Sequence, residues 1–185
     1  MGLKKIANNI KLRLKVRKIG RSSYALGEMF DAIGHILILL PPLKLVKKDM
    51  KGLLDDLGRL FPRAAYTLVS HPGASAEYSV LELSSGNKLS PNETDLSWSG
   101  LPRRQFIEKI KNLEADLLID LSAGKSQYNA YITACSGVPV RIGTYGSWGN
   151  PIYNIEIKSN YIQNEQLILK SIIEVLKNFR AGVNN

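Results

Sequence analysis

Long hydrophobic runs are missing from this chain of 185 residues. The longest apolar run, residues 36–40, stops at Pro41 and Pro42. A membrane-spanning helix needs about 20 consecutive apolar residues, and a secretory leader needs an uninterrupted apolar core, which the charged N-terminus lacks. We therefore expect a cytoplasmic protein without a transmembrane segment, either free or associated with the cytoplasmic face of a membrane.

Cysteine and histidine are scarce as well. Cys135 is the single cysteine, which excludes an internal disulfide, and its apolar neighbours predict a small core residue rather than a reactive thiol. His35 enters an apolar run and is expected to be structural, and neither it nor His71 has a partner at metal-ligand or nucleophile spacing. Asp120 is one isolated carboxylate, which does not make an acid/base pair. We predict no metal, no cofactor and no catalytic residue.

Acidic residues are missing from the first 21 positions, although this stretch holds eight of the 25 lysines and arginines. The rest of the chain is almost balanced, so most of the net charge of +9 resides in this N-terminal arm. We predict that the arm binds an anionic partner and that the body has a separate role. The predicted anion-binding residues are Lys4, Lys5, Lys11, Arg13, Lys15, Arg17, Lys18 and Arg21.

The apolar residues of the arm have the spacing of a helix over residues 3–18. They form one stripe of Leu3, Ile6, Ala7, Ile10 and Leu14, and a second stripe on the opposite side of Leu12, Val16 and Ile19. A helix that is apolar on two sides would fit between two surfaces. Alternation with period two over residues 11–17 leaves a strand as the alternative.

Basic amphipathic arms bind nucleic acid or anionic membranes. Nucleic acid or a ribonucleoprotein within a larger complex is slightly favoured here, because an interfacial membrane helix prefers one wide apolar face with Trp or Phe, and the arm has neither residue. We expect the basic amphipathic arm over residues 1–27, a single domain over residues 28–180 and a disordered tail over residues 181–185.

The body alternates between strand and helix patterns, which predicts an α/β fold. Strands are expected over residues 35–40, 65–70, 78–83, 116–121, 139–142 and 152–157. Helices are expected over residues 43–60, 102–113, 125–136 and 161–179. Residues 84–102 are predicted as a long loop that Trp98 pins to the body. This order indicates a Rossmann-like, doubly wound, mainly parallel sheet with helices on both faces.

Open parallel sheets bind ligands beyond the carboxyl ends of their strands. Gly124, Lys125 and Ser126 follow one strand but do not make a phosphate loop, because Ile119 stands where that motif needs glycine. They could hold one anion at a helix N-terminus, or Ser126 could simply cap the helix. The possible ligand cleft comprises Gly124, Lys125, Ser126, Arg141, Tyr145, Trp148 and His71.

Three segments together resemble the N-terminal half of heptosyltransferases, the lipopolysaccharide glycosyltransferases with two facing Rossmann-like domains. These are Asp116–Leu121, the helix that opens at Lys125 and Ser126, and Val138–Gly143 with its Arg-Ile-Gly ending. The resemblance covers residues 34–179 and implies an acceptor-side domain. It also implies a Gly-Asp pair after the first strand, but residues 40–44 contain no carboxylate.

Two functional interpretations remain open at this point. The first is a non-catalytic binding or scaffold subunit, built on a heptosyltransferase-like half and anchored by its arm to RNA, a ribonucleoprotein, a large complex or a membrane surface. The second is the acceptor-side half of a split bacterial glycosyltransferase, with the nucleotide-sugar domain on a separate chain. The missing aspartate favours the first interpretation.

Overall fold

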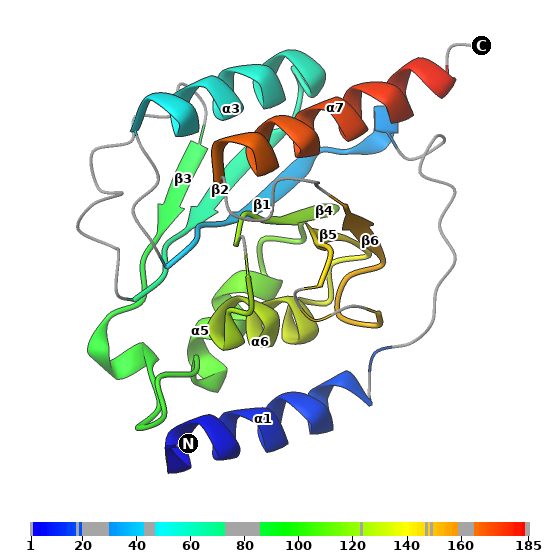
Figure 1. Cartoon of the computed structure of the whole chain (residues 1–185). Coiled ribbons are helices and arrows are strands. Elements are labelled where there is room, and N and C mark those ends of the chain that lie inside the picture. The colour runs from blue at the N-terminus through cyan, green and yellow to red at the C-terminus, as the bar shows by residue number, and fades with distance from the viewer. Residues whose placement is uncertain are drawn as a thin grey trace.

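The structure, a computed structural model, describes residues 2–17, 19, 30–42, 47–72, 86–122, 124–146, 148, 150–158 and 165–183. Six strands form one parallel sheet in the order β3-β2-β1-β4-β5-β6 (Figure 1). The strands are β1 (His35–Leu39), β2 (Ala65–Val69), β3 (Gly86–Leu89), β4 (Leu117–Asp120), β5 (Val140–Thr144) and β6 (Ile155–Ile157). The order reverses direction between β1 and β4, as in a doubly wound sheet. The predicted Rossmann-like α/β fold is confirmed.

Helices cover both faces of the sheet (Figure 1). The helices are α1 (Leu3–Val16), α3 (Lys47–Leu60), α5 (Arg104–Lys111), α6 (Gln127–Ser136) and α7 (Glu165–Val183), with short 3-10 helices at Phe30–Ala32 and Glu93–Asp95. α3 and α7 lie on one face, and α5 and α6 lie on the other. α1 lies outside α6 and adds a further layer. α7 continues to Val183, past the predicted domain end at residue 180.

Strand β1 explains why the sheet needs both helical layers. Ile36 and Ile38 pack into the core under α3 and α7, while Leu37 and Leu39 pack with Phe106 of α5 on the opposite face. These four side chains of β1 are fully buried. A continuous apolar run is the pattern expected of a parallel strand that is covered on both faces.

The segment after β2 contains a strand where the sequence predicted a loop. β3 lies within residues 84–102, which the sequence predicted to be a loop. The strand was missed because its Gly-Asn-Lys residues are exposed and pair with β2 through the backbone, so they show no pattern of buried apolar side chains. The strand predicted over 78–83 lies outside the described residues. Trp98 does not pin the loop, since it is 64 % exposed; Leu101 and Asp95 are buried there instead, and Asp95 pairs with Lys109 at 3.2 Å.

The described segments hold neither a membrane-spanning helix nor a cluster of metal-ligating residues. None of their helices combines the length and the hydropathy needed to cross a bilayer. In the same segments, no three His, Cys, Asp or Glu side chains gather in a way that could hold a metal ion.

Candidate functional site

The N-terminal helix α1 is held against α6 by a small apolar cluster. Leu12 is 2 % exposed and packs, together with the partly buried Val16, against Ala130 of α6 and against Ile152 and Tyr153. Burying a leucine side chain in this way contributes about 2 kcal/mol. The arm is therefore a helix, as predicted, and its second apolar stripe is used inside the molecule.

Polar contacts fix the N-terminal half of the same helix. Gln127 Nε2 donates hydrogen bonds to the Lys5 carbonyl at 3.2 Å and to Asn9 Oδ1 at 2.7 Å. The buried Asn8 donates from Nδ2 to the Ser99 carbonyl at 3.1 Å. These bonds set the rotation of α1 about its axis, so that a defined face points away from the protein.

The outward face of α1 carries the other apolar stripe. Leu3 is 82 % exposed, Ile6 is 45 %, and Ile10 and Leu14 are each 55 %. We call these four residues the outer stripe. It extends over about 16 Å, at 1.5 Å per helical residue. Four large aliphatic side chains in one exposed row are more than the scattered apolar residues of an ordinary surface.

Basic residues border the outer stripe on both sides. At 100° per residue, Lys4, Lys11 and Lys15 follow one edge of the stripe and Arg13 lies on the other, while Arg17, the C-cap residue, borders the C-terminal end of the stripe. The helix contains no acidic residue, and its first turn has lysines where the macrodipole is positive and where Gly2 supplies no side-chain cap. These lysines weaken the helix locally, so their charge points to an external partner.

A groove of about 650 Å³ opens beside α1, between this helix, the start of α6 and the chain around Trp148. We call it the α1 groove. Its cations are Lys5, Arg13 and Arg17 of the arm and Lys125 of the predicted ligand cleft. Its described lining residues include no carboxylate. The groove therefore joins two sets of residues that are far apart in the sequence.

The indole of Trp148 forms one wall of the α1 groove. Trp148 Nε1 donates to the Ser126 carbonyl at 3.2 Å, and Lys125 Nζ lies 5.9 Å from the ring centroid. The ring also packs partly against the cluster that holds Leu12. The groove thus combines positive charge with an aromatic surface that is fixed in place.

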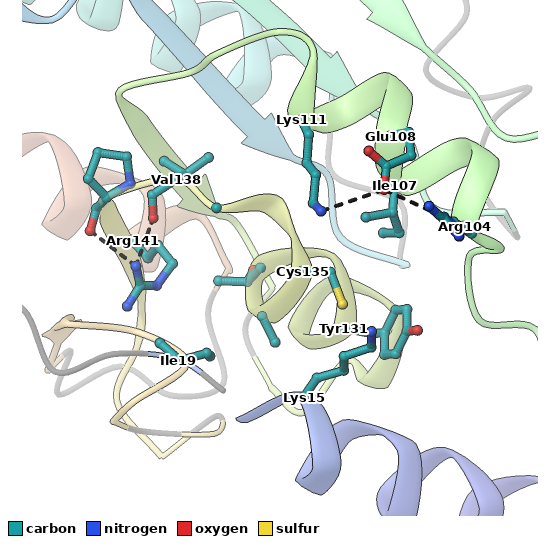
Figure 2. A pocket seen from close by; sticks show the side chains of 14 residues that line it. Lys15, Ile19, Arg104, Ile107, Glu108, Lys111, Tyr131, Cys135, Val138 and Arg141 are labelled. Atoms are coloured by element: carbon teal, nitrogen blue, oxygen red, sulfur yellow. Dashed lines mark hydrogen bonds and ion pairs between the residues drawn. The ribbon is translucent and has the colours of Figure 1, made fainter. Parts of the chain in front are cut away.

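A second hollow, of about 730 Å³, lies between α1, α5 and the end of α6 (Figure 2). It is lined by Lys15, Arg104, Lys111 and Arg141, but it also contains the carboxylate of Glu108. Glu108 pairs with Lys111 at 3.6 Å and with Arg104 at 4.0 Å, as the dashed lines in Figure 2 mark. Its positive charge is therefore partly neutralised, unlike that of the α1 groove.

Cys135 faces this second hollow, near Lys15 and Tyr131 (Figure 2). Burial raises the pKa of the thiol, and the nearby Lys15 and Lys111 ammonium groups, together with a hydrogen bond to Tyr131, offset this only in part. The thiol is half-buried and is predominantly protonated at neutral pH. This agrees with the predicted small, unreactive residue.

The carboxyl edge of the sheet, where doubly wound proteins bind ligands, is occupied by a buried polar network. Asn129 Nδ2 donates to the Leu40 carbonyl at 3.1 Å, to Asp120 Oδ1 at 2.8 Å and to Ser122 Oγ at 2.9 Å. Tyr153 Oη donates to Asp120 Oδ2. Asp120 is 2 % exposed, and burial raises its pKa although these hydrogen bonds oppose the shift. Its carboxyl group serves the fold and does not face solvent.

The predicted cleft residues are divided among several places. Ser126 caps α6, since its Oγ accepts a hydrogen bond from the backbone N–H of Asn129 at 3.2 Å. His71 packs edge-on to Tyr128, with ring centroids 5.1 Å apart, and burial lowers its pKa. Tyr145 is 60 % exposed. Only Lys125 and Trp148 of the predicted set line the α1 groove.

Two of the remaining residues have structural environments. Arg141 is 7 % exposed, and its guanidinium donates to the carbonyls of Val138, Pro139, Pro151 and Ile152 at 2.7–3.2 Å. His35 is structural as expected, because its ring nitrogens contact the Leu113 carbonyl and Thr67 Oγ1. Gly124 is exposed in the turn before α6. Lys18 and Arg21 of the arm lie outside the described residues.

Several residues that build this region could not be identified from the sequence. Gln127 holds α1, Asn129 and Tyr153 hold the sheet edge through Asp120, and Arg104 and Lys111 line the second hollow. For Arg104 and Lys111, the sequence offered only the high basic content of the whole chain. Their partners are distant in sequence, so no local spacing could have identified them.

Comparison with known proteins gives a family and a fold neighbour. Residues 82–179, just over half of the chain, match a family described as "Family of unknown function (DUF6913)". No curated protein matches the sequence. Among solved structures, the glycosyl transferase family 9 protein from Veillonella parvula DSM 2008 superposes with a TM-score of 0.53 at 12% identity, over 80% of this chain and 41% of that one. The chain spans less than half of that protein, and the likeness supports the fold alone.

Proposed function

This chain belongs to the DUF6913 family of unknown function, and we propose that it is a non-catalytic binding protein that docks through α1 on an anionic membrane surface. The observation that carries the proposal is the outer stripe: Leu3, Ile6, Ile10 and Leu14 are exposed along a helix whose opposite side is buried on α6. One apolar row bordered by basic residues is a feature of interfacial membrane helices, and in α1 aliphatic side chains stand where such helices usually carry Trp or Phe.

The packing of α1 on α6 favours a membrane over nucleic acid as the partner. The arm has apolar residues on two sides, and a helix with both sides exposed to solvent would not be expected to bind a membrane surface. Leu12 and Val16 now pack within the protein, so a single apolar row is left for a partner. Phosphate contacts with RNA would use the lysines and arginines but would leave Ile6 and Ile10 in water. An anionic lipid surface would bind the basic residues through its headgroups and bury the apolar side chains between its lipids.

The energetics of such docking are adequate for reversible binding. Each basic residue near an anionic bilayer contributes about 1 kcal/mol, and five border the outer stripe. Inserting the exposed parts of four aliphatic side chains adds about 1 kcal/mol each. Much of this sum offsets the entropy lost on association. The binding should therefore be reversible and sensitive to salt.

The second candidate function is the acceptor-side half of a glycosyltransferase, which the fold neighbour favours. Such a reaction needs a base within reach of the acceptor hydroxyl. Asp120 ends β4 at the carboxyl edge of the sheet, but it is buried and hydrogen-bonded to Asn129 and Tyr153. Its carboxylate is therefore not placed to reach an acceptor hydroxyl in this structure. Turnover of a nucleotide sugar by the purified protein would support this candidate over ours.

Replacing Ile6 and Ile10 together by serine should weaken binding to anionic vesicles on the order of 30-fold. The reason is the loss of about 2 kcal/mol of apolar insertion, at 1.4 kcal/mol per tenfold. Cosedimentation with phosphatidylcholine vesicles, with and without phosphatidylserine, measures the effect. Both side chains are about half exposed, so the fold should be unchanged.

The matched control is Phe179→Ser, which removes an apolar side chain that is 36 % exposed on α7, on the far face of the sheet. It should bind vesicles as the wild type does. The nucleic-acid interpretation would replace ours if the protein bound single-stranded polyuridylate but no vesicle, and if the serine substitutions left that binding intact.

A further inference from the structure

The α1 groove differs in charge from the hollow shown in Figure 2. Lys5, Arg13, Arg17 and Lys125 enter it from α1 and from the turn before α6, and within the described part of the chain none of the four forms an ion pair. In the second hollow Glu108 compensates two cations. Arg13 and Arg17 lie about one helical turn apart and repel each other, and a bound anion would relieve that repulsion.

The groove also offers an apolar surface beside its cations. Leu12 and Ile152 are nearly fully buried at its base, and the Trp148 ring stands as a wall that its own hydrogen bond to the Ser126 carbonyl holds at 3.2 Å. Binding sites with a largely apolar lining and a few convergent charged groups fit ligands that have both kinds of surface. A bare inorganic ion would use only the charges.

We propose that the α1 groove binds a phosphate ester, with the phosphate between Arg13 and Lys125 and the organic part against Trp148. Arginine recognises phosphate through paired N–H donors, and lysine acts as a point charge. The proposal extends the membrane-docking function, because Arg13 and Arg17 both border the outer stripe and line the groove. A phospholipid headgroup beside the docked helix and a soluble phosphate ester share this chemistry.

The test uses the full chain with Trp98→Phe, which leaves Trp148 as the only indole and the reporter of the groove. Fluorescence is titrated with inorganic phosphate, with glycerol 3-phosphate and with dihexanoyl phosphatidic acid below its micelle concentration. We expect saturable binding of the two esters and at least tenfold weaker binding of inorganic phosphate. Tighter binding of the phosphatidic acid assigns a lipid source, and equal binding of the two esters assigns a soluble one.

Replacing Arg13 and Lys125 by glutamine should raise the dissociation constants of both esters at least tenfold. The matched control replaces Arg104 and Lys111, which line the hollow of Figure 2, by glutamine and should leave the constants unchanged. Circular dichroism checks that both variants are folded. The proposal is overturned if neither ester changes the Trp148 signal, or if the Arg13 and Lys125 variant binds as the wild type does.

The soluble titrations contain no membrane, so this test and the vesicle test can fail separately. Vesicle binding without ester binding would overturn only the proposal that the α1 groove binds a phosphate ester. Ester binding without vesicle binding would overturn the membrane proposal and leave the groove as a site for a soluble phosphate ester.

Discussion

Gly143→Ala should destabilise the protein by about 3 kcal/mol, at the upper end of the usual cost of overpacking a core. A methyl group on Gly143 would lie 2.6 Å from two ring carbons of Tyr153, well inside van der Waals contact. The ring cannot move away easily, because its hydroxyl donates to Asp120 and it is packed in one buried cluster with Leu12 and Ile152. The change should also loosen α1, which shares that cluster.

Urea denaturation followed by circular dichroism measures this loss. The matched control is Gly58→Ala in α3, where no atom lies within 4 Å of the added carbon. That variant should gain about 0.5–1 kcal/mol, because alanine favours a helix over glycine. Equal unfolding midpoints for Gly143→Ala and the wild type would show that Tyr153 does not pack against β5 as described.

Arg141→Ala should cost a similar amount, about 3 kcal/mol. The substitution leaves the carbonyls of Val138, Pro139, Pro151 and Ile152 without the guanidinium that binds them. Hydrogen bonds from a charged donor contribute about 1.5–3 kcal/mol each, and water that enters the hollow would replace part of this. The start of β5 and the segment before β6 should then separate.

Arg141→Lys and Arg104→Ala complete this experiment. A lysine keeps the charge but cannot span four carbonyls, so it should recover less than half of the loss. Arg104 lines the same hollow with its side chain 94% exposed, and its removal should change the unfolding free energy by less than about 0.5 kcal/mol. Equal costs for the two alanine variants would show that Arg141 is not a structural residue.

The elements with a continuous apolar run or a helical repeat could be predicted from the sequence. Residues 36–39 of β1 and 117–119 of β4 form continuous apolar runs because helices cover both faces of the sheet. α6 ends at Gly137, whose φ of +79° suits glycine. β3 could not be predicted, since its bonds to β2 are made by the backbone and its side chains are mostly exposed.

The candidate site could be predicted in parts but not as a whole. The sequence indicated a basic helix and, separately, Lys125 and Trp148. It could not place them on one groove, because more than 100 residues separate α1 from α6 and only tertiary packing brings them together. Nor could the sequence indicate which apolar side of the helix is buried. The choice follows from the bonds that Asn8 and Gln127 make.

The most direct measurement of the membrane proposal is the depth of the outer stripe in a bilayer. A nitroxide is attached at Ile10→Cys in a Cys135→Ala background, with Lys51→Cys on α3 as the label on the far face. On vesicles of phosphatidylcholine with phosphatidylserine, the label at position 10 should become accessible to oxygen and protected from a water-soluble nickel chelate, while the label at position 51 stays in water. A label at position 10 that remains as accessible to nickel as the one at position 51 would contradict the proposal that α1 inserts its outer stripe into the membrane.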